Sequence, residues 1–192
     1  MPNLFVGGSS EIAQCAAKLK KNLDNLSRKK SKNYRKNIIV KNYSKKNINK
    51  ALNKIKIKYE NVVIFNGWFS NSFITNFDEK DFYKSLKINL ITPLEIAKII
   101  IKKDILKKNG CIYFISSIAS KKNIKGNAYY SIAKNALELS AKILSQEQRP
   151  RNLRISLINI GLVNNKMGQS TQKYVSKIKK KKVDFMKLNF VA

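Results

Sequence analysis

A serine, a tyrosine and a lysine in the second half of the sequence have the types and the spacing of a proton-transfer site. Ser117 follows the apolar run at 111–115, and Tyr130 opens a segment of helical periodicity 13 residues further on. Lys134 lies four residues after Tyr130, so both side chains share one face of a helix. A nearby ammonium stabilises the phenolate and lowers the pKa of a tyrosine from about 10 toward neutral pH. This makes Tyr130 a plausible proton donor in a chain without histidine, although the same spacing is common on ordinary helices.

A pair of glycines near the start of the chain is a second candidate feature. Gly7 and Gly8 follow an apolar run that ends at Val6, and they precede a helical segment that begins at Glu11. Glycine permits a tight turn there and lets backbone N–H groups approach a pyrophosphate, with positive partial charge from the helix N-terminus. Many such turns contain glycine for steric reasons alone. A nucleotide site and a purely structural turn are therefore equal alternatives at this point.

Short apolar runs that alternate with helical segments would position these groups. Strands are expected at 3–7, 23–27, 37–40, 61–65, 111–115 and 153–158, and helices at 11–21, 48–58, 82–103 and 129–148. This alternation is typical of βαβ units and a mostly parallel sheet. Pro93 would kink the third helix or start its second part. The apolar face of the first helix would consist of Ile12, Cys15, Ala16 and Leu19.

Composition limits the class of protein. The chain of 192 residues, 43% of them hydrophobic, allows one domain with a substantial core. No apolar run reaches the roughly 18 residues of a membrane span, and the start lacks the features of a signal peptide. Two cysteines, Cys15 and Cys111, exclude a disulfide scaffold and favour a reducing, cytoplasmic setting.

The formal net charge of +29, from 40 basic and 11 acidic residues, raises the hypothesis of a nucleic-acid partner. Most of the basic residues are lysine, whereas bidentate recognition of phosphates and base edges favours arginine. The lysines are spread along the chain without interleaved aromatic residues that would stack on bases. We therefore expect a solvated basic surface and keep a nucleic-acid-associated protein as the less favoured alternative.

From Asn3 to about Met167 the chain resembles the short-chain dehydrogenase/reductase family, whose fold is a Rossmann sheet. Asn89, Ser117, Tyr130 and Lys134 match the family's catalytic asparagine, serine, tyrosine and lysine. The resemblance implies redox chemistry between a carbonyl and an alcohol, with the hydride carried by a nicotinamide cofactor. Tyr130 would exchange a proton with the substrate oxygen, and Ser117 would hydrogen-bond that oxygen. Lys134 would lower the tyrosine pKa and bind the nicotinamide ribose, and Asn89 would position a water that relays protons toward Lys134.

Three turns of the chain resemble the cofactor-binding segments of the same family. Gly7 matches the first glycine of its Thr-Gly-x-x-x-Gly-x-Gly turn, whereas Glu11 and Ala13 stand where two later glycines are usual. The segment around Asn66 is similar to the Asn-Asn-Ala-Gly motif, and the one around Gly161 is similar to the Asn-Pro-Gly motif. The residues that the resemblance assigns to the cofactor in these turns and at the catalytic pair are Gly7, Ser9, Ser10, Ile12, Asn66, Gly67, Tyr130, Lys134, Gly161 and Val163.

The end of the second strand bears on the choice of cofactor. An acidic residue there suits the ribose hydroxyl of NAD, and a basic residue suits the 2′-phosphate of NADP. Arg28 follows this strand and Asp24 is the only acid nearby, so NADP(H) is favoured over NAD(H). Asn42 matches the position where the family often has an aspartate near the adenine. The alternative is that Arg28 is one more surface cation.

We expect a single doubly wound α/β domain at 1–168 with strand order 3-2-1-4-5-6 and a C-terminal strand that is shortened or missing. Residues 169–192 would form a basic tail, a remnant of the substrate loop. After Gly161 the hydrophobic pattern is lost, which predicts a mobile surface segment in which only 185–191 could pack.

The partners implied by the resemblance are a small carbonyl or alcohol substrate and a second copy of the chain. A homodimer or homotetramer would form through the two long helices at 82–103 and 129–148. A catalytically weak Rossmann scaffold that acts through binding is the alternative, because the later glycines of the first turn are replaced and the tail is short.

Overall fold

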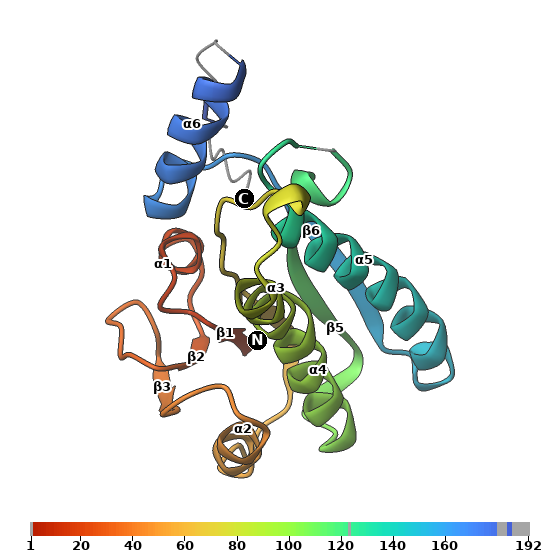
Figure 1. The fold of residues 1–192 in the computed structure, drawn as a ribbon. Helices are drawn as coiled ribbons and strands as arrows, with labels where there is room; N and C mark the ends of the chain where they lie inside the picture. The colour runs from red at the N-terminus through yellow and green to blue at the C-terminus, as the bar shows by residue number, and fades with distance from the viewer. Residues whose placement is uncertain (1, 123, 180–183, 186–192) are drawn as a thin grey trace.

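The computed structural model describes residues 2–122, 124–179 and 184–185, and within them the chain forms one six-stranded sheet (Figure 1). The strand order is β3-β2-β1-β4-β5-β6 and every neighbouring pair is parallel, as the alternating pattern and the resemblance predicted. The strands are β1 (Asn3–Val6), β2 (Leu23–Ser27), β3 (Lys36–Ile39), β4 (Tyr59–Ile64), β5 (Leu106–Ser117) and β6 (Arg154–Ile160).

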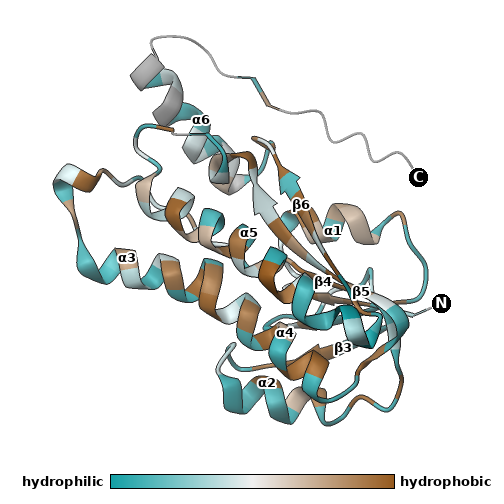
Figure 2. Cartoon of the chain, turned by 90° about the vertical axis from the view of Figure 1, so that its right-hand side faces the viewer, coloured by the Kyte–Doolittle hydropathy of each residue, from teal (hydrophilic) through white to brown (hydrophobic). Residues whose placement is uncertain are grey.

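Helices cover the sheet unequally. The helices are α1 (Glu11–Ala17), α2 (Lys45–Leu52), α3 (Glu79–Leu86), α4 (Thr92–Lys102), α5 (Ala128–Gln148) and α6 (Lys166–Lys179). Residues of α2, α4 and α5 form the large core with one face of the sheet, and Figure 2 shows hydrophobic residues along the strands and α4. Leu4 and Val6 belong to this core, whereas Phe5, pointing the opposite way, packs in a smaller cluster with residues of α1. No helix among the described residues is long and apolar enough to cross a membrane.

The first helix is shorter than predicted and turns a different face to the sheet. It ends at Ala17, and its buried residues are Ala13 and Ala17, whereas Cys15 and Leu19 are exposed. The predicted apolar face of Ile12, Cys15, Ala16 and Leu19 is therefore wrong. Small side chains one turn apart allow the helix backbone to pack closely against the sheet, which a count of large apolar residues cannot anticipate.

The predicted long helix around Pro93 is divided into two helices by a π-helical turn. Lys87–Ile91 form this turn between α3 and α4, and Pro93 lies in the first turn of α4. The N–H of Thr92 still donates to the carbonyl of Lys87, so the chain stays helical, and the widened π-helical turn accommodates a proline that has no N–H of its own. The interpretation that Pro93 starts the second part is confirmed.

The prediction that the chain loses regular structure after Gly161 is wrong. Residues Lys166–Lys179 form α6, and the side chain of Asn165 caps it by accepting a hydrogen bond of 2.7 Å from the backbone N–H of Gly168. A Cβ on Gly168 would lie 1.7 Å from the carbonyl oxygen of Val163, so only glycine fits this first turn. Of the segment 185–191 that was expected to pack, only Phe185 lies within the described residues.

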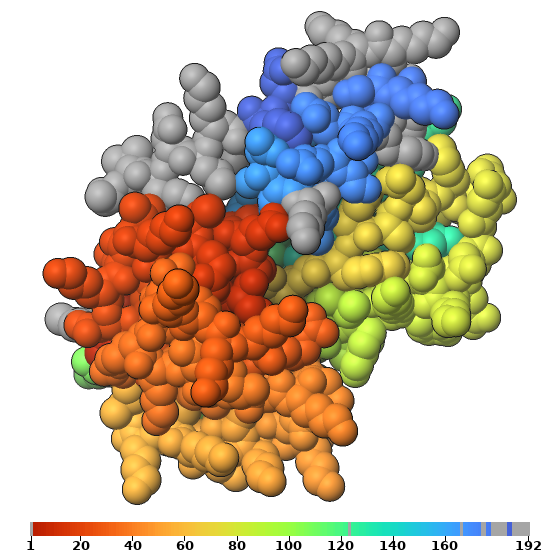
Figure 3. Space-filling view, turned by 90° about the vertical axis from the view of Figure 1, so that its left-hand side faces the viewer, coloured from red at the N-terminus to blue at the C-terminus, as the bar shows by residue number. Residues whose placement is uncertain are grey.

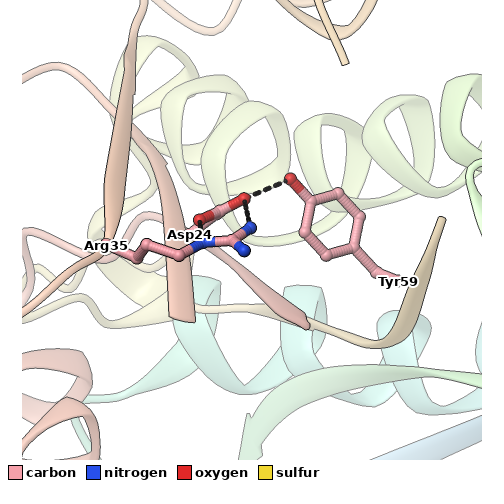
Figure 4. A network of polar contacts seen from close by, with 3 residues as sticks. All are labelled: Asp24, Arg35 and Tyr59. Atoms are coloured by element: carbon pink, nitrogen blue, oxygen red, sulfur yellow. Dashed lines mark hydrogen bonds and ion pairs between the residues drawn. The ribbon is translucent and has the colours of Figure 1, made fainter. Parts of the chain in front are cut away.

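An ion pair between the buried Asp24 and the half-exposed Arg35 braces the amino ends of three strands (Figure 4). Arg35 donates to the two carboxylate oxygens of Asp24 at 2.9 and 2.8 Å, and the hydroxyl of Tyr59 donates to the same carboxylate at 2.8 Å. Asp24 is 0% exposed and is the second residue of β2. It is therefore committed to the sheet and lies away from the carboxyl end of that strand.

Candidate active site

A cavity of about 410 Å³ lies at the carboxyl ends of β1, β4, β5 and β6. The strand order changes direction between β1 and β4, and ligands of open α/β sheets bind at such switch points. On the left-hand face, Figure 3 shows the N-terminal segment and α6, far apart in sequence, side by side. The cavity wall contains the predicted residues Ser9, Ser10, Ile12, Asn66, Gly67, Ser117, Tyr130, Lys134, Gly161 and Val163.

Ser117 and Tyr130 meet in this cavity from different elements. Ser117 is the last residue of β5, and Tyr130 lies in the first turn of α5. The hydroxyl of Ser117 hydrogen-bonds the phenol of Tyr130 and also accepts from the backbone N–H of Ala119 at 3.2 Å. The neighbouring Tyr129 instead is 2% exposed, and its hydroxyl accepts from the backbone N–H of Asp78. Of the two adjacent tyrosines, only Tyr130 is placed for chemistry.

Lys134 lies one helical turn beyond Tyr130 and is 2% exposed. Its ammonium donates to the carbonyl oxygens of Ile115 at 2.8 Å and Asn66 at 3.4 Å. These carbonyls belong to β5 and to the segment after β4, so the lysine ties both to α5. Burial lowers the pKa of Lys134 to about 8, because a charge is costly away from water.

The pKa of Tyr130 differs from the expectation drawn from its spacing to Lys134. Burial raises this pKa to about 12, and the hydrogen bond from Ser117 acts in the opposite direction. The ammonium of Lys134 is not among the causes of this shift, and its hydrogen bonds go to backbone carbonyls. Tyr130 is consequently a protonated donor throughout the physiological range of pH.

Asn89 is fully buried in the π-helical turn and holds the segment that follows β4. Its Nδ2 donates to the carbonyl oxygen of Trp68 at 2.8 Å and to Ser85 Oγ at 3.0 Å, and its Oδ1 accepts from the N–H of Trp68 at 2.9 Å. Both side-chain atoms are therefore engaged with protein atoms. The structure places Asn89 behind the cavity wall rather than in the wall itself.

The turn after β1 requires glycine at two positions. Gly7 has a φ of +79°, which strongly favours glycine. A Cβ on Gly8 would lie 2.4 Å from Asn25 Oδ1 and 2.8 Å from the hydroxyl of Tyr34, so the turn has no room for a side chain. Ser10 caps α1 by accepting from the N–H of Ala13 at 3.3 Å. Glu11, at one of the positions where the family usually has glycine, lines the cavity.

Three predicted cofactor residues are not part of the cavity wall: Gly7, in the turn just described, Arg28 and Asn42. Arg28 is exposed directly after β2, near Tyr43, whose pKa is raised to about 12 by burial while the guanidinium of Arg28 acts to lower it. Asn42 accepts hydrogen bonds from the N–H of Ser44 at 3.0 Å and from Asn47 Nδ2 at 2.8 Å. The amide of Asn42 therefore organises the start of α2.

Residues of α6 line the cavity, which the sequence did not lead us to expect. Met167, Gly168 and Thr171 line the cavity, as does Asn165. An asparagine at the start of a segment with helical periodicity was the available signal for this helix. Among the described residues no cluster of three histidine, cysteine, aspartate or glutamate side chains is placed to hold a metal ion.

Known proteins resemble this chain in sequence and in fold. The model of the family described as enoyl-(acyl carrier protein) reductase matches residues 12–187. Human L-xylulose reductase is 28% identical over 91 residues, which cover 47% of this chain and 37% of that protein. A 3-oxoacyl-[acyl-carrier-protein] reductase of Buchnera aphidicola is 29% identical over 126 residues, 63% of this chain and 51% of the relative.

A solved short-chain dehydrogenase family protein of Francisella tularensis superposes with a TM-score of 0.80 at 21% identity, covering 93% of this chain and 77% of that one. The chain therefore belongs to the short-chain dehydrogenase/reductase family, a family of NAD(P)-binding oxidoreductases. It spans between about a third and about a half of the two curated relatives named above.

Proposed function

We propose that this protein transfers hydride between NADP(H) and a small carbonyl or alcohol substrate, with Tyr130 as the proton donor and acceptor. The observation that carries the proposal is the meeting of Ser117, Tyr130 and Lys134 in one cavity at the switch point of the sheet. Two relatives are named as reductases of a keto sugar and of a 3-oxoacyl thioester, which supports a carbonyl substrate.

The cavity residues fit a dinucleotide. Gly7 and Gly8 keep side chains out of the turn after β1, where the backbone would approach the pyrophosphate. Asn66 is 8% exposed, lines the cavity and has an Oδ1 with no hydrogen-bond partner in the protein. A buried acceptor of this kind calls for a donor from a ligand or water. We assign it to the cofactor, as we do the backbone at Gly67, Gly161 and Val163.

The bound nicotinamide supplies or accepts the hydride, which no side chain can do. Tyr130 donates its phenolic proton to the substrate oxygen during reduction and takes it back in the reverse direction. Ser117 donates a hydrogen bond to the same oxygen and stabilises its developing negative charge. Lys134, one helical turn from Tyr130, would bind the ribose hydroxyls of the nicotinamide half of the cofactor. Because the amide of Asn89 is engaged with Trp68 and Ser85, we assign Asn89 to holding the segment after β4 in place.

The preference for NADP(H) rests on the carboxyl end of β2. Arg28 is an exposed cation at this position, and Asp24, the nearby acid, is buried in its pair with Arg35. No carboxylate in β2 is therefore free to accept from the ribose hydroxyl of NAD, whereas Arg28 can approach a 2′-phosphate.

We further propose that the protein associates through α4 and α5. Between these helices lies a groove lined by Ile91, Leu94, Ile101, Ile143 and Leu144. Ile91 and Ile143 are 41% and 50% exposed, and Leu139 on α5 is 59% exposed. Apolar side chains gathered on one face are typical of a subunit interface, so a homodimer or homotetramer is expected.

NADPH titration and a carbonyl panel test the proposal. Isothermal titration should detect NADPH binding, and oxidation of NADPH should follow addition of one member of a panel of keto sugars, 3-oxoacyl thioesters and steroid-like ketones. Absence of binding up to ~1 mM NADPH would overturn the enzyme function. Binding without oxidation of NADPH by any member of the panel would favour the scaffold alternative, which Glu11 in the glycine turn already supports.

A further inference from the structure

A buried carboxylate lies behind the proposed active site, and the proposed mechanism does not use it. Glu138 is on α5, one helical turn beyond Lys134, and is 7% exposed. Its Oε1 accepts hydrogen bonds from two serine hydroxyls, Ser116 Oγ at 3.2 Å and Ser120 Oγ. A carboxylate is rarely buried without such compensation, because removing it from water is costly.

Glu138 does not form an ion pair with Lys134. The ammonium of Lys134 donates to the carbonyls of Ile115 and Asn66, and no ion pair joins Glu138 to any cation within the described part of the chain. The lowered pKa of Lys134 has burial as its cause. The hydrogen bonds of Glu138 are therefore with Ser116 and Ser120 and not with Lys134.

These serines flank Ser117 on both sides. Ser116 precedes it in β5. Ser120 is the last residue of the short 3-10 helix, Ile118–Ser120, that follows it. Ser120 Oγ lies 2.7 Å from the carbonyl oxygen of Ser117, and Ser117 Oγ caps the same turn by accepting from the N–H of Ala119. The position of Ser117 Oγ is thus set by the turn whose last residue is held by Glu138.

We infer that Glu138 is a positioning residue that fixes Ser117 Oγ relative to the Tyr130 phenol. Ser117 and Tyr130 stand on different elements, and the carboxylate ties the serine's turn to the helix that carries the tyrosine. An error of about 1 Å in such a pair costs on the order of 100-fold in rate. The inference rests on the proposed catalytic roles of Ser117 and Tyr130.

Substitution of Glu138 separates this role from general stability. Glu138→Gln keeps an oxygen that accepts from the serine hydroxyls, and Glu138→Leu removes it. We expect Glu138→Leu to lower kcat about 100-fold with the KM for NADPH nearly unchanged, and Glu138→Gln to retain kcat within about threefold. Glu79→Leu, which removes an exposed carboxylate on α3, is the matched control and should leave kcat within about twofold.

Hydrogen exchange at the Ala119 amide provides a readout that does not depend on turnover. This amide is held by Ser117 Oγ, so its exchange should accelerate about tenfold or more in Glu138→Leu and not in Glu79→Leu. Unchanged exchange, or unchanged kcat, in a folded Glu138→Leu variant overturns the inference. Should that variant fail to fold, Ser120→Ala breaks the same link with a smaller change, and unaltered exchange at Ala119 in it has the same consequence. A wild-type protein without activity would contradict the proposed function alone, since exchange at Ala119 still decides the role of Glu138.

Discussion

The ammonium nitrogen of Lys134 lies 5.7 Å from the centre of the Tyr130 ring, and the two residues are one turn apart on α5. The nitrogen is held there by hydrogen bonds to the carbonyls of Ile115 and Asn66, so its position is set by β5 and the segment after β4 as well as by α5. The phenol meanwhile contacts Ser117 at the end of β5. Lys134 and Ser117 thus approach Tyr130 from different directions, and each can be tested separately.

Replacing Tyr130 with phenylalanine should abolish turnover. The substitution removes the only proton donor that we assign to the substrate oxygen and keeps the ring that packs edge-on against Phe69. We therefore expect kcat to fall by about 1,000-fold or more, with the dissociation constant for NADPH changed less than about threefold. Steady-state kinetics and isothermal titration measure the two quantities, and activity that survives the change would refute the assignment.

The burial of Lys134 makes stability depend on pH in a defined direction. Its pKa is about 8 in the folded protein against 10.5 in the unfolded chain, so between these values the unfolded state binds more protons. The stability contribution of this group therefore rises with pH from about 8 to 10.5 and is at its lowest below pH 8. The stability of Lys134→Met relative to the wild type should therefore fall by about 3 kcal/mol as the pH rises from below 8 to above 10.5.

Denaturant unfolding of both proteins at several pH values measures this difference. Because the comparison is between wild type and variant, tyrosines that lie away from Lys134 and have a pKa raised by burial, such as Tyr34 and Tyr59, contribute equally to both and cancel. A difference in stability that does not change between pH 7 and pH 10 would contradict the burial of a charged lysine.

Glu11 should weaken the binding of an anionic cofactor. It is in the first turn of α1 and lines the cavity beside the glycine turn, where the pyrophosphate is expected. Glu11→Gln removes the like charge and should lower the dissociation constant for NADPH about three- to tenfold. Titration at low and high salt checks the cause, because the gain should diminish at high ionic strength. Equal affinities of wild type and variant at low salt would place the pyrophosphate elsewhere.

Arg28 should decide between the two nicotinamide cofactors. Arg28→Ala is expected to raise the KM for NADPH about tenfold and to leave the KM for NADH nearly constant, because only NADPH carries the 2′-phosphate. Lys30→Ala, which removes an exposed cation two residues further on, is the matched control. Equal effects of the two substitutions would mean that Arg28 acts only through the general positive field of the protein.

A charge on the face formed by α4 and α5 should separate the subunits. Ile143 is half-exposed beside the groove between these helices, and burying a lysine at an apolar interface is costly. Ile143→Lys should shift the mass measured by light scattering from oligomer to monomer. Leu19→Lys makes the same change at a similarly exposed site after α1 and should leave the mass unaltered. A wild-type monomer, or an oligomer in both variants, would exclude this interface.

The strands and helices that carry the site could be predicted from the sequence, because each has a hydrophobic periodicity set by neighbouring residues alone. The strands that end at Val6 and Ile64 are short and largely apolar, and the second half of β5 is an apolar run; the helix of Tyr130 and Lys134 has regular apolar spacing. The face that a helix turns to the sheet depends also on contacts with residues distant in the sequence. Ala13 rather than Ile12 faces the sheet, and α6 covers the cavity although its sequence is mostly polar.

The sequence by itself determined the alternation of strands and helices and the spacing that puts Tyr130 and Lys134 on one face, because both follow from the period of the helix and the strand. Tertiary packing was needed to place Tyr130 rather than Tyr129 in the cavity and to join the side-chain amide of Asn89 to the backbone of Trp68 by hydrogen bonds. It also decided that Glu138 holds the turn after Ser117. These outcomes depend on hydrogen bonds between residues that are 18 to 51 positions apart, and such contacts leave no periodic trace in the chain.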